Sequence, residues 1–217
     1  TFSIGLEGSP DLIAAQKVAD YLGTNHTNVI VTEKEMLDAI DLTIYQIESK
    51  DITTIRASVP MFLLSEYIRD NTDIKVILSG EGSDEASGSY LYFHNAPSPK
   101  EFQDECLRLL KDVRYFDVLR SDKTTAVAGL EIRVPYFDKG FMEYYMGIEP
   151  EKKVVRDKME KYLLRKAFEN SLPEEIVWRR KDGFSDGVSS FEKPWYEIIH
   201  DYTMKNYELN EKEYYLS

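Results

Sequence analysis

The chain has 217 residues, of which 42% are hydrophobic, so it is long enough to form a soluble globule with a sizeable core. Its 39 Asp and Glu residues outnumber its 27 Lys and Arg residues, and the net charge of -12 argues against a nucleic-acid partner, whose phosphates would be repelled. Its single cysteine, Cys106, excludes an internal disulfide, and no apolar run approaches the ~20 residues that cross a bilayer. We therefore expect no membrane span and a cytoplasmic location.

Strands and helices are predicted to alternate over the first half of the chain. Ser9 and Pro10 are typical of a helix start, Gly23 of a helix end, and Thr32 with Glu35 of a capping box. The predicted strands lie at residues 1–6, 28–31 and 74–78, and the predicted helices at 10–22, 32–48 and 60–70. The last strand is β-branched and apolar, as buried parallel strands are. This alternation favours an α/β fold with an open parallel sheet.

The second half of the chain predicts helices. Amphipathic stretches lie at residues 99–121, 138–147, 157–170 and 191–206, and no internal repeat interrupts them. Cys106 falls inside the first of these helices and is interpreted as a core residue. The histidines are far apart, without metal-ligand spacing, and are interpreted as structural; they are His26, His94 and His200.

The most informative segment, Ser-Gly-Glu-Gly-Ser-Asp-Glu at residues 79–85, directly follows the strand predicted at 74–78. Ligands of open α/β sheets bind beyond the carboxyl ends of strands, where this loop would lie. Its two glycines allow the backbone to approach an anion closely. Its three carboxylates are compatible with such a ligand if a divalent cation intervenes or if one acts as a general base. On composition alone, a solvated acidic turn is the alternative.

Several segments in this order resemble the synthetase domain of glutamine-hydrolysing asparagine synthetases, members of the adenylating PP-loop ATP pyrophosphatase superfamily. These segments are residues 2–11, 51–58, 79–94, 131–138, 158–161 and 178–187. The resemblance covers nearly all of residues 1–217 and implies one synthetase domain. It also implies an open parallel sheet of the adenine nucleotide alpha hydrolase (PP-loop) type with a helical second half.

The resemblance implies an activity, namely the ATP-dependent amidation of aspartate to asparagine through a β-aspartyl-AMP intermediate. Ammonia would come from glutamine, hydrolysed in an N-terminal glutaminase domain. ATP and Mg²⁺ are the expected cofactors, aspartate and ammonia the expected partners, and the parent protein is compatible with a homodimer.

Roles for individual residues follow from the same resemblance. Glu81 would be the base that takes a proton from ammonia or from the following tetrahedral intermediate, and its place between two glycines predicts an accessible carboxylate. Lys181 would meet charge on the α-phosphate, and Asp84 would hold magnesium. The other expected contacts are Ile4, Ser79 and Gly80 with the nucleotide; Thr53, Thr54, Arg56, Ser83 and Asp84 with pyrophosphate or the intermediate; and Gly82 and Glu85 with the substrate.

Structural alternatives exist for some of these residues, since Ile4 could be ordinary core and Arg133 with Asp138 could form a buried pair that joins two elements. Glu81, Asp84, Arg56 and Lys181 are expected to line one cleft. Residues 181–187 lack helical periodicity and predict a mobile loop that closes on phosphate.

The sequence departs from the family pattern in two places. Residues 86–89 are Ala-Ser-Gly-Ser where the family has a bulky aromatic and a glycine pair, so looser packing is expected behind Glu85. The family's Ser-Gly-Gly-x-Asp-Ser loop should immediately precede Thr1, so the 217 residues alone are expected to be inactive. A β-lactam-synthetase-like ligase, whose relatives pair a tyrosine with the glutamate, and a catalytically incompetent nucleotide-binding remnant are the alternatives.

Overall fold

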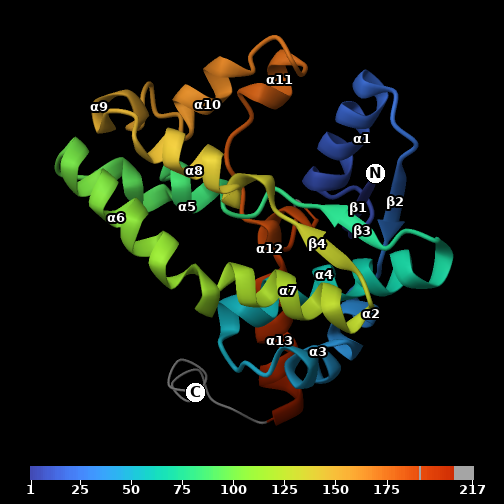
Figure 1. Cartoon of the computed structure of the whole chain (residues 1–217). Coiled ribbons are helices and arrows are strands. Elements are labelled where there is room, and N and C mark those ends of the chain that lie inside the picture. The colour runs from blue at the N-terminus through green and yellow to red at the C-terminus, as the bar shows by residue number, and fades with distance from the viewer. Residues whose placement is uncertain (191, 208–217) are drawn as a thin grey trace. The chain divides into compact units, whose positions relative to one another are not determined.

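The structure, a computed structural model, describes residues 1–190 and 192–207 as helices joined by short strands and loops (Figure 1). The chain divides into two compact units, one formed by Thr1–Leu64 with Asp182–Ser217 and the other by Ser65–Lys181. The boundary at residues 64–65 falls within α4 (Ile52–Asn71). No helix among the described residues combines the length and the apolar character that a membrane crossing requires.

The first unit opens with the predicted strand, helix and strand. β1 (Phe2–Gly5) pairs in parallel with β2 (Thr27–Ile30), and α1 (Pro10–Leu22) connects them. The Ser9 hydroxyl caps the start of α1, and Gly23 ends it at φ 66, a left-handed conformation that glycine adopts readily. These boundaries confirm the prediction. They could be predicted because the cap signals lie between residues that are close together in the chain.

The capping box is also confirmed, since the side chains of Thr32 and Glu35 each bond the other's backbone N–H. The single helix predicted over 32–48 is wrong. It divides at Ala39 into α2 (Glu33–Asp38) and α3 (Ile40–Ile47). The ψ of Ala39 is -9, well away from the helical value near -42, so Ala39 separates the two helices, although its N–H still donates to the carbonyl of Glu35 and its carbonyl accepts the N–H of Thr43.

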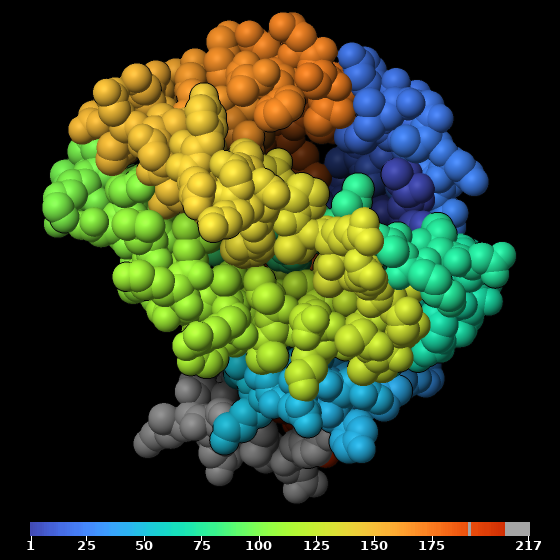
Figure 2. All heavy atoms as spheres, viewed as in Figure 1, coloured from blue at the N-terminus to red at the C-terminus, as the bar shows by residue number. Residues whose placement is uncertain are grey.

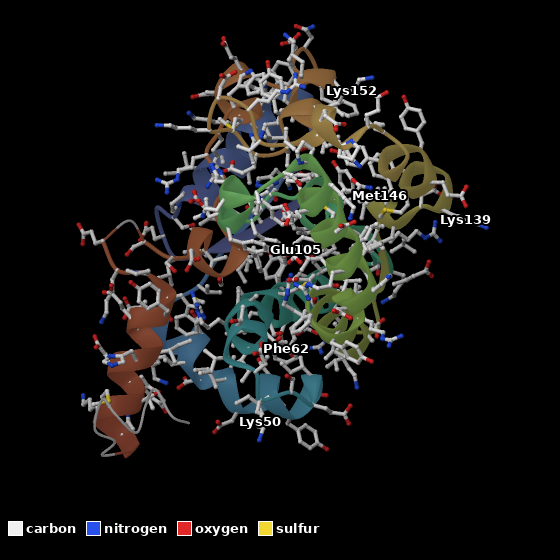
Figure 3. All side chains as sticks on the ribbon, turned by 90° about the vertical axis from the view of Figure 1, so that its left-hand side faces the viewer. Lys50, Phe62, Glu105, Lys139, Met146 and Lys152 are labelled. Carbon is white, nitrogen blue, oxygen red and sulfur yellow. The ribbon has the colours of Figure 1, made fainter. Side chains whose placement is uncertain are left out.

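The rest of this unit is helical. α4 begins at Ile52, well before the helix predicted at 60–70, because the Asp51 carboxylate accepts the backbone N–H of Thr54 at 2.7 Å and caps the earlier turn. Phe62 of α4, labelled in Figure 3, is almost fully buried. The remaining helices of the unit are α12 (Phe184–Gly187) and α13 (Trp195–Tyr207).

The second unit contains the strand that precedes the acidic loop. β3 (Val76–Leu78) pairs in parallel with β4 (Glu131–Arg133), which lies beside it in Figure 1. β4 was not predicted, because three residues show no periodicity. The prediction that β3 is buried is wrong, since Leu78 is 75% exposed. Pairing with β4 satisfies one edge of β3 but does not cover the face that carries Leu78.

The parallel α/β class is confirmed, but a single open sheet is not. Among the described residues, the hydrogen-bonded strands form two separate two-stranded sheets, β1 with β2 and β3 with β4. The PP-loop arrangement of one continuous sheet therefore stays a prediction.

Helices make up most of the second unit. They are α5 (Ser83–Ser87), α6 (Pro99–Asp112), α7 (Asp117–Val127), α8 (Lys139–Met146), α9 (Pro150–Lys153), α10 (Tyr162–Ala167) and α11 (Glu174–Val177), with 3-10 turns at Leu91–Asn95, Val113–Tyr115 and Pro135–Phe137. The helix predicted over 99–121 divides between α6 and α7, because Phe116 leaves the helical region at φ -126 and ψ -105. α8 (yellow) is at the surface on the face shown in Figure 2.

An aromatic cluster forms the core beside α6. The rings of Phe93 and Phe102 meet edge to face at 4.9 Å, and Cys106 is fully buried against them. Burial raises the pKa of the Cys106 thiol to about 12, so this thiol is a packed, neutral group. The interpretation of Cys106 as a core residue is confirmed.

Candidate functional site

The acidic loop continues directly from β3. The backbone N–H of Ser79 donates to the carbonyl of Arg133 at 2.9 Å, so pairing with β4 extends one residue past the strand. Gly82 has φ 91, and a Cβ added there would lie 2.5 Å from the Phe137 ring. A Cβ on Gly80 would meet no atom within 4 Å. The loop is therefore tightly packed at Gly82 and open at Gly80.

Asp84 is held between two lysines. Its Oδ1 forms an ion pair with Lys161 and accepts the hydroxyl of Ser89, and its Oδ2 lies 3.1 Å from Nζ of Lys181. Burial alone would raise the pKa of Asp84, but the two ammonium groups outweigh burial and lower this pKa to about 2. Asp84 is therefore a permanent anion, and the cluster of Asp84, Lys161 and Lys181 carries a net positive charge.

Sequence reasoning gave Lys161 no role, although Lys161 lies in one of the matched segments. Its ammonium group also donates to the Ser83 hydroxyl at 2.9 Å. Burial lowers the pKa of Lys161, while Asp84 opposes that shift. Asp157, Lys158 and Lys161 all have positive φ, which is uncommon outside glycine. Backbone strain of this kind clusters at functional sites and is a signal that only the structure reveals.

Glu81 forms a second cluster with α7. Its Oε1 lies 3.0 Å from Nη2 of Arg120, and the same nitrogen lies 2.8 Å from Oδ1 of Asp117. The Glu81 side chain is 17% exposed, so the prediction of an accessible carboxylate is wrong. Burial raises the pKa of Glu81, Arg120 opposes the rise, and Asp117 and Asp84 add to it. A carboxylate with a raised pKa is suited to general-base chemistry near neutral pH.

Glu85 faces the interior of the unit. It is 3% exposed, and its carboxylate accepts the hydroxyl of Tyr90. Burial raises the pKa of Glu85 to about 7. The packing behind it is tight, because a Cβ on Gly88 would lie 2.3 Å from the Phe102 ring. The expected looser packing is therefore wrong, and direct contact between Glu85 and a substrate is not supported.

Glu85 and Glu81 are linked through Tyr90, Asp117 and Arg120. The Tyr90 hydroxyl, which bonds Glu85, also lies 3.3 Å from Oδ2 of Asp117. Asp117 in turn bonds Arg120, which reaches Glu81. The polar chain therefore runs continuously from Glu85 to Glu81.

Arg56 belongs to the first unit, where its Nη2 lies 2.7 Å from Oδ1 of Asp186 and its guanidinium lies 5.5 Å from the centre of the Tyr196 ring. Its Nε is buried and has no hydrogen-bond partner among the described residues. Thr53 is exposed, whereas Thr54 is buried near the start of α4. Asp186 was not predicted as a partner, and Arg56 keeps an unused donor compatible with an anionic ligand.

The segment at 184–187 forms one helical turn, so the expectation of a stretch without helical structure is wrong there. The backbone N–H of Leu6 donates to the carbonyl of Val188 at 2.8 Å, which ties this turn to the end of β1. Its mobility stays a prediction. Ile4 is 1% exposed in β1, so its side chain packs in the core, and contact with adenine stays a prediction.

The proposed structural pair of Arg133 and Asp138 is wrong. Arg133 bonds Glu131 instead, with both side chains exposed, and the Asp138 carboxylate caps α8 by accepting the N–H of Phe141. His94, by contrast, does have a structural partner, because its Nε2 lies 2.7 Å from the buried carboxylate of Glu160.

The donor set around Asp84 does not fit a magnesium ion. Both of its carboxylate oxygens are engaged by ammonium groups, and a divalent cation there would be repelled by Lys161 and Lys181. Within the described parts of the chain, no group of three or more metal-ligating side chains is brought together. The prediction that Asp84 holds magnesium is therefore not supported by this arrangement.

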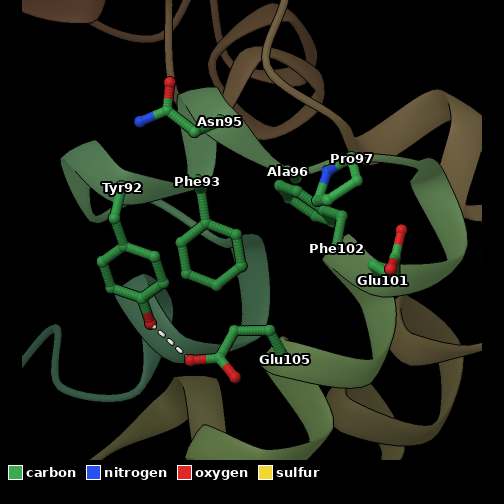
Figure 4. Close-up of a pocket in the computed structure, with 8 residues that line it drawn as sticks. All are labelled: Tyr92, Phe93, Asn95, Ala96, Pro97, Glu101, Phe102 and Glu105. Atoms are coloured by element: carbon green, nitrogen blue, oxygen red, sulfur yellow. Dashed lines mark hydrogen bonds between the residues drawn. The ribbon is translucent and has the colours of Figure 1, made fainter.

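A separate pocket lies on the second unit, with a volume of 240 Å³. Figure 4 shows its lining, in which the rings of Tyr92 and Phe93 stand beside Glu105. The Tyr92 hydroxyl donates to Glu105 at 2.7 Å. No residue of the acidic loop lines this pocket, and the three aromatic residues of its lining, Tyr92, Phe93 and Phe102, already pack on one another.

Partly buried acids, paired with lysine and arginine side chains, follow the end of a parallel strand here, and this is the position at which α/β proteins bind ligands. Over residues 1–103 and 95–214 the chain matches the asparagine synthase family, and it belongs to that family.

Similar proteins agree with this assignment. The chain is 53% identical over 204 residues to the glutamine-hydrolysing asparagine synthetase of Mesocricetus auratus, 52% to that of Gallus gallus and 51% to that of Homo sapiens. Each alignment covers 93% of this chain and 36% of the relative, so the chain spans about a third of the length of these relatives.

Proposed function

We propose that the chain is the synthetase part of an enzyme that converts aspartate to asparagine at the expense of ATP, through a β-aspartyl-AMP intermediate. Ammonia would come from glutamine, hydrolysed in another part of the full-length protein. The observation that carries the proposal is the pairing of a two-lysine cluster at Asp84 with a buried base, Glu81, three residues earlier in the same loop. The relatives' name supports the same activity.

Lys181 and Lys161 would supply positive charge to phosphate groups of ATP. Asp84 holds both ammonium groups in place without neutralising the pair, so the cluster attracts an anion. Charge that develops on phosphate as pyrophosphate leaves would be stabilised by such fixed cations. Gly80 leaves open space beside the loop into which a ligand fits without a side-chain clash.

Glu81 would act in the second half of the reaction. Ammonia is mostly ammonium at neutral pH, so the attacking nitrogen must lose a proton before or after the amide bond forms. A carboxylate with a raised pKa accepts that proton better than an ordinary surface glutamate. In this loop, Glu81 combines burial, a raised pKa and a fixed cation, Arg120, beside its carboxylate.

Magnesium is the usual counter-ion of ATP, but no step of this mechanism passes through it. Its binding by this chain, the homodimer of the parent protein and the cytoplasmic location stay predictions from the resemblance. Contacts of Ser79 and Gly80 with the nucleotide would use carbonyl groups or the Gly80 amide, because the Ser79 amide is already bonded.

A second candidate, a β-lactam-synthetase-like ligase, is favoured by the Tyr90–Glu85 hydrogen bond, a tyrosine–glutamate pair. The glutamate in this pair is not Glu81, which bonds arginine instead. We rank this candidate below asparagine synthesis for that reason.

The test is ammonia-dependent asparagine formation by the full-length protein, supplied with ATP, magnesium, aspartate and ammonium chloride. Supplying ammonia removes the need for glutamine hydrolysis. Asparagine and AMP should form in equal amounts, and Glu81→Gln should slow asparagine formation by about 10²–10⁴-fold. If neither asparagine nor AMP appears, the proposal is wrong, and a nucleotide-binding remnant becomes the better description.

A further inference from the structure

Glu81 lies between Gly80, which has open space around it, and Gly82, which packs against the Phe137 ring. Glycines flank it on both sides, and a Cβ on Gly80 would meet no atom within 4 Å. Glycine adopts more backbone conformations than any other residue. A carboxylate that must face one reacting nitrogen therefore needs an anchor from outside its own loop.

Arg120 supplies that anchor from the interior of a helix. Its side chain is 6% exposed, and its backbone is held within α7, where its N–H donates to the Phe116 carbonyl and its own carbonyl accepts the Thr124 hydroxyl. The Nη2 nitrogen lies 3.0 Å from Oε1 of Glu81. A buried arginine with a fixed backbone is a rigid point of attachment for a carboxylate.

Asp117 binds the same nitrogen of Arg120. It begins α7 one turn before Arg120, and its Oδ1 lies 2.8 Å from Nη2. Two carboxylates thus share one guanidinium, so Arg120 cannot neutralise both. The second carboxylate keeps negative charge beside Glu81.

We propose that Arg120 is a positioning residue, which holds Glu81 in the orientation where it accepts a proton, with Asp117 fixing Arg120 through the same nitrogen. This inference rests on the proposed function and deepens it. Arg120 acts through Glu81 and touches no substrate. Its loss should therefore reduce kcat and leave the KM for ATP nearly unchanged.

The charges around Glu81 give the proposal a distinctive signature. The groups that shift its pKa are Arg120 and Asp117 of α7 and Asp84 of α5. Arg120→Met removes the cation that favours the charged carboxylate, so the acid limb of the kcat–pH profile should move to higher pH. Asp117→Asn keeps a hydrogen-bond acceptor for Arg120 but removes a negative charge, so the same limb should move to lower pH.

The experiment measures ammonia-dependent asparagine formation by the full-length protein and its variants across pH. Arg120→Met is expected to reduce kcat by about 10–100-fold with the KM for ATP within about threefold, as misplacement of a reacting group does. Arg120→Lys, which keeps the charge, should recover part of the loss. Arg114→Met, on the turn just before α7, is the matched control and should leave kcat unchanged, because Arg114 contacts Tyr115 and not Glu81.

A double variant separates positioning from general support of the fold. If Arg120 acts only through Glu81, then Arg120→Met in a Glu81→Gln background should cost less than about threefold beyond Glu81→Gln alone. If the fold-losses of kcat in the two single variants multiply in the double variant, the proposal is wrong and Arg120 has a structural role. If Arg120→Met does not accumulate as folded protein, Arg120→Lys and Asp117→Asn decide the question through the direction in which the acid limb moves.

Failure of this inference is distinguishable from failure of the proposed function. If the unmodified protein makes asparagine while Arg120→Met and Arg120→Lys retain full kcat, the positioning role is wrong and the proposed function stands. If the unmodified protein makes no asparagine, both are wrong.

Discussion

The ammonium group of Lys181 lies 3.1 Å from Oδ2 of Asp84, although the two residues are far apart in the sequence. Lys161 binds the other oxygen of the same carboxylate. A buried anion therefore separates two cations that would otherwise repel each other. In the proposed reaction, a phosphate of ATP would take over part of this role when it binds.

Asp84→Asn should destabilise the protein and at the same time increase its response to pyrophosphate. Without the carboxylate, two mostly buried ammonium groups lose their partner, at a cost of about 2–4 kcal/mol in the free energy of unfolding. Pyrophosphate would restore a negative charge between them. The measurement is the thermal unfolding midpoint of the variant and of the unmodified protein, with and without sodium pyrophosphate.

The matched control is Asp104→Asn, which breaks the exposed ion pair of Lys100 and Asp104 on α6. Exposed pairs contribute roughly 0–1 kcal/mol, so the midpoint should hardly move and pyrophosphate should add nothing specific. An Asp84→Asn protein as stable as this control, with no extra gain from pyrophosphate, would contradict the two-lysine anion site.

Lys161→Met and Lys181→Met should both impair the proposed reaction. Both ammonium groups meet the same carboxylate, so both should contribute positive charge where phosphate binds. We expect kcat/KM for ATP to fall by about tenfold or more in each variant. Lys166→Met, an exposed lysine of α10 paired with Glu169, is the control. Equal rates for the Lys161 and Lys166 variants would assign Lys161 a structural role only.

Local signals allowed much of the fold to be predicted. The cap at Ser9, the capping box at Thr32 and the glycine-rich loop after β3 depend on residues within a few positions of one another, and each lies where the sequence indicates. The helix interruptions at Ala39 and Phe116 depend on how the helices pack. The apolar periodicity of the sequence continues through both positions and therefore does not reveal them. β4 is too short for any pattern to reveal.

The partners of the site residues could not be predicted, because each comes from a different element of the unit. In the sequence Arg120 is an ordinary helical arginine, although its side chain is 6% exposed in the structure. The hydroxyl-bearing residues on its helix, Ser121, Thr124 and Thr125, are also buried and bond their own helix carbonyls.

Gly82→Ala should destabilise the loop, whereas Gly80→Ala should not. Gly82 has φ 91, and the added Cβ would meet the Phe137 ring at 2.5 Å, while Gly80 has open space around it. Left-handed backbone and the clash together should cost about 1–3 kcal/mol for Gly82→Ala. Thermal unfolding midpoints of the two variants, compared at one protein concentration, are the measurement. Similar midpoints for the two variants would show that the loop relaxes without cost to avoid the clash with Phe137.

Glu85 should make the protein less stable as pH rises through neutrality. Burial raises its pKa from an ordinary value of 4.5 to about 7, so the folded protein binds a proton that the unfolded chain releases. That contribution to stability is complete below pH 4.5 and is lost as pH rises through about 7. Glu81, whose pKa is also raised, adds to the same trend. Other carboxylates, such as Asp84 with its pKa near 2, lose their contribution only in strong acid.

Glu85→Gln removes the titrating proton while keeping a carbonyl that accepts the Tyr90 hydroxyl. The fall in unfolding free energy between pH 5 and pH 8 should therefore shrink, by on the order of 2 kcal/mol, relative to the unmodified protein. Urea unfolding at several pH values in this range measures it. Glu101→Gln, a glutamate in the first turn of α6, is the control and should keep the full pH dependence. An unchanged slope in Glu85→Gln would mean that Glu85 is already ionised in the folded protein and that Tyr90 stabilises the charged carboxylate.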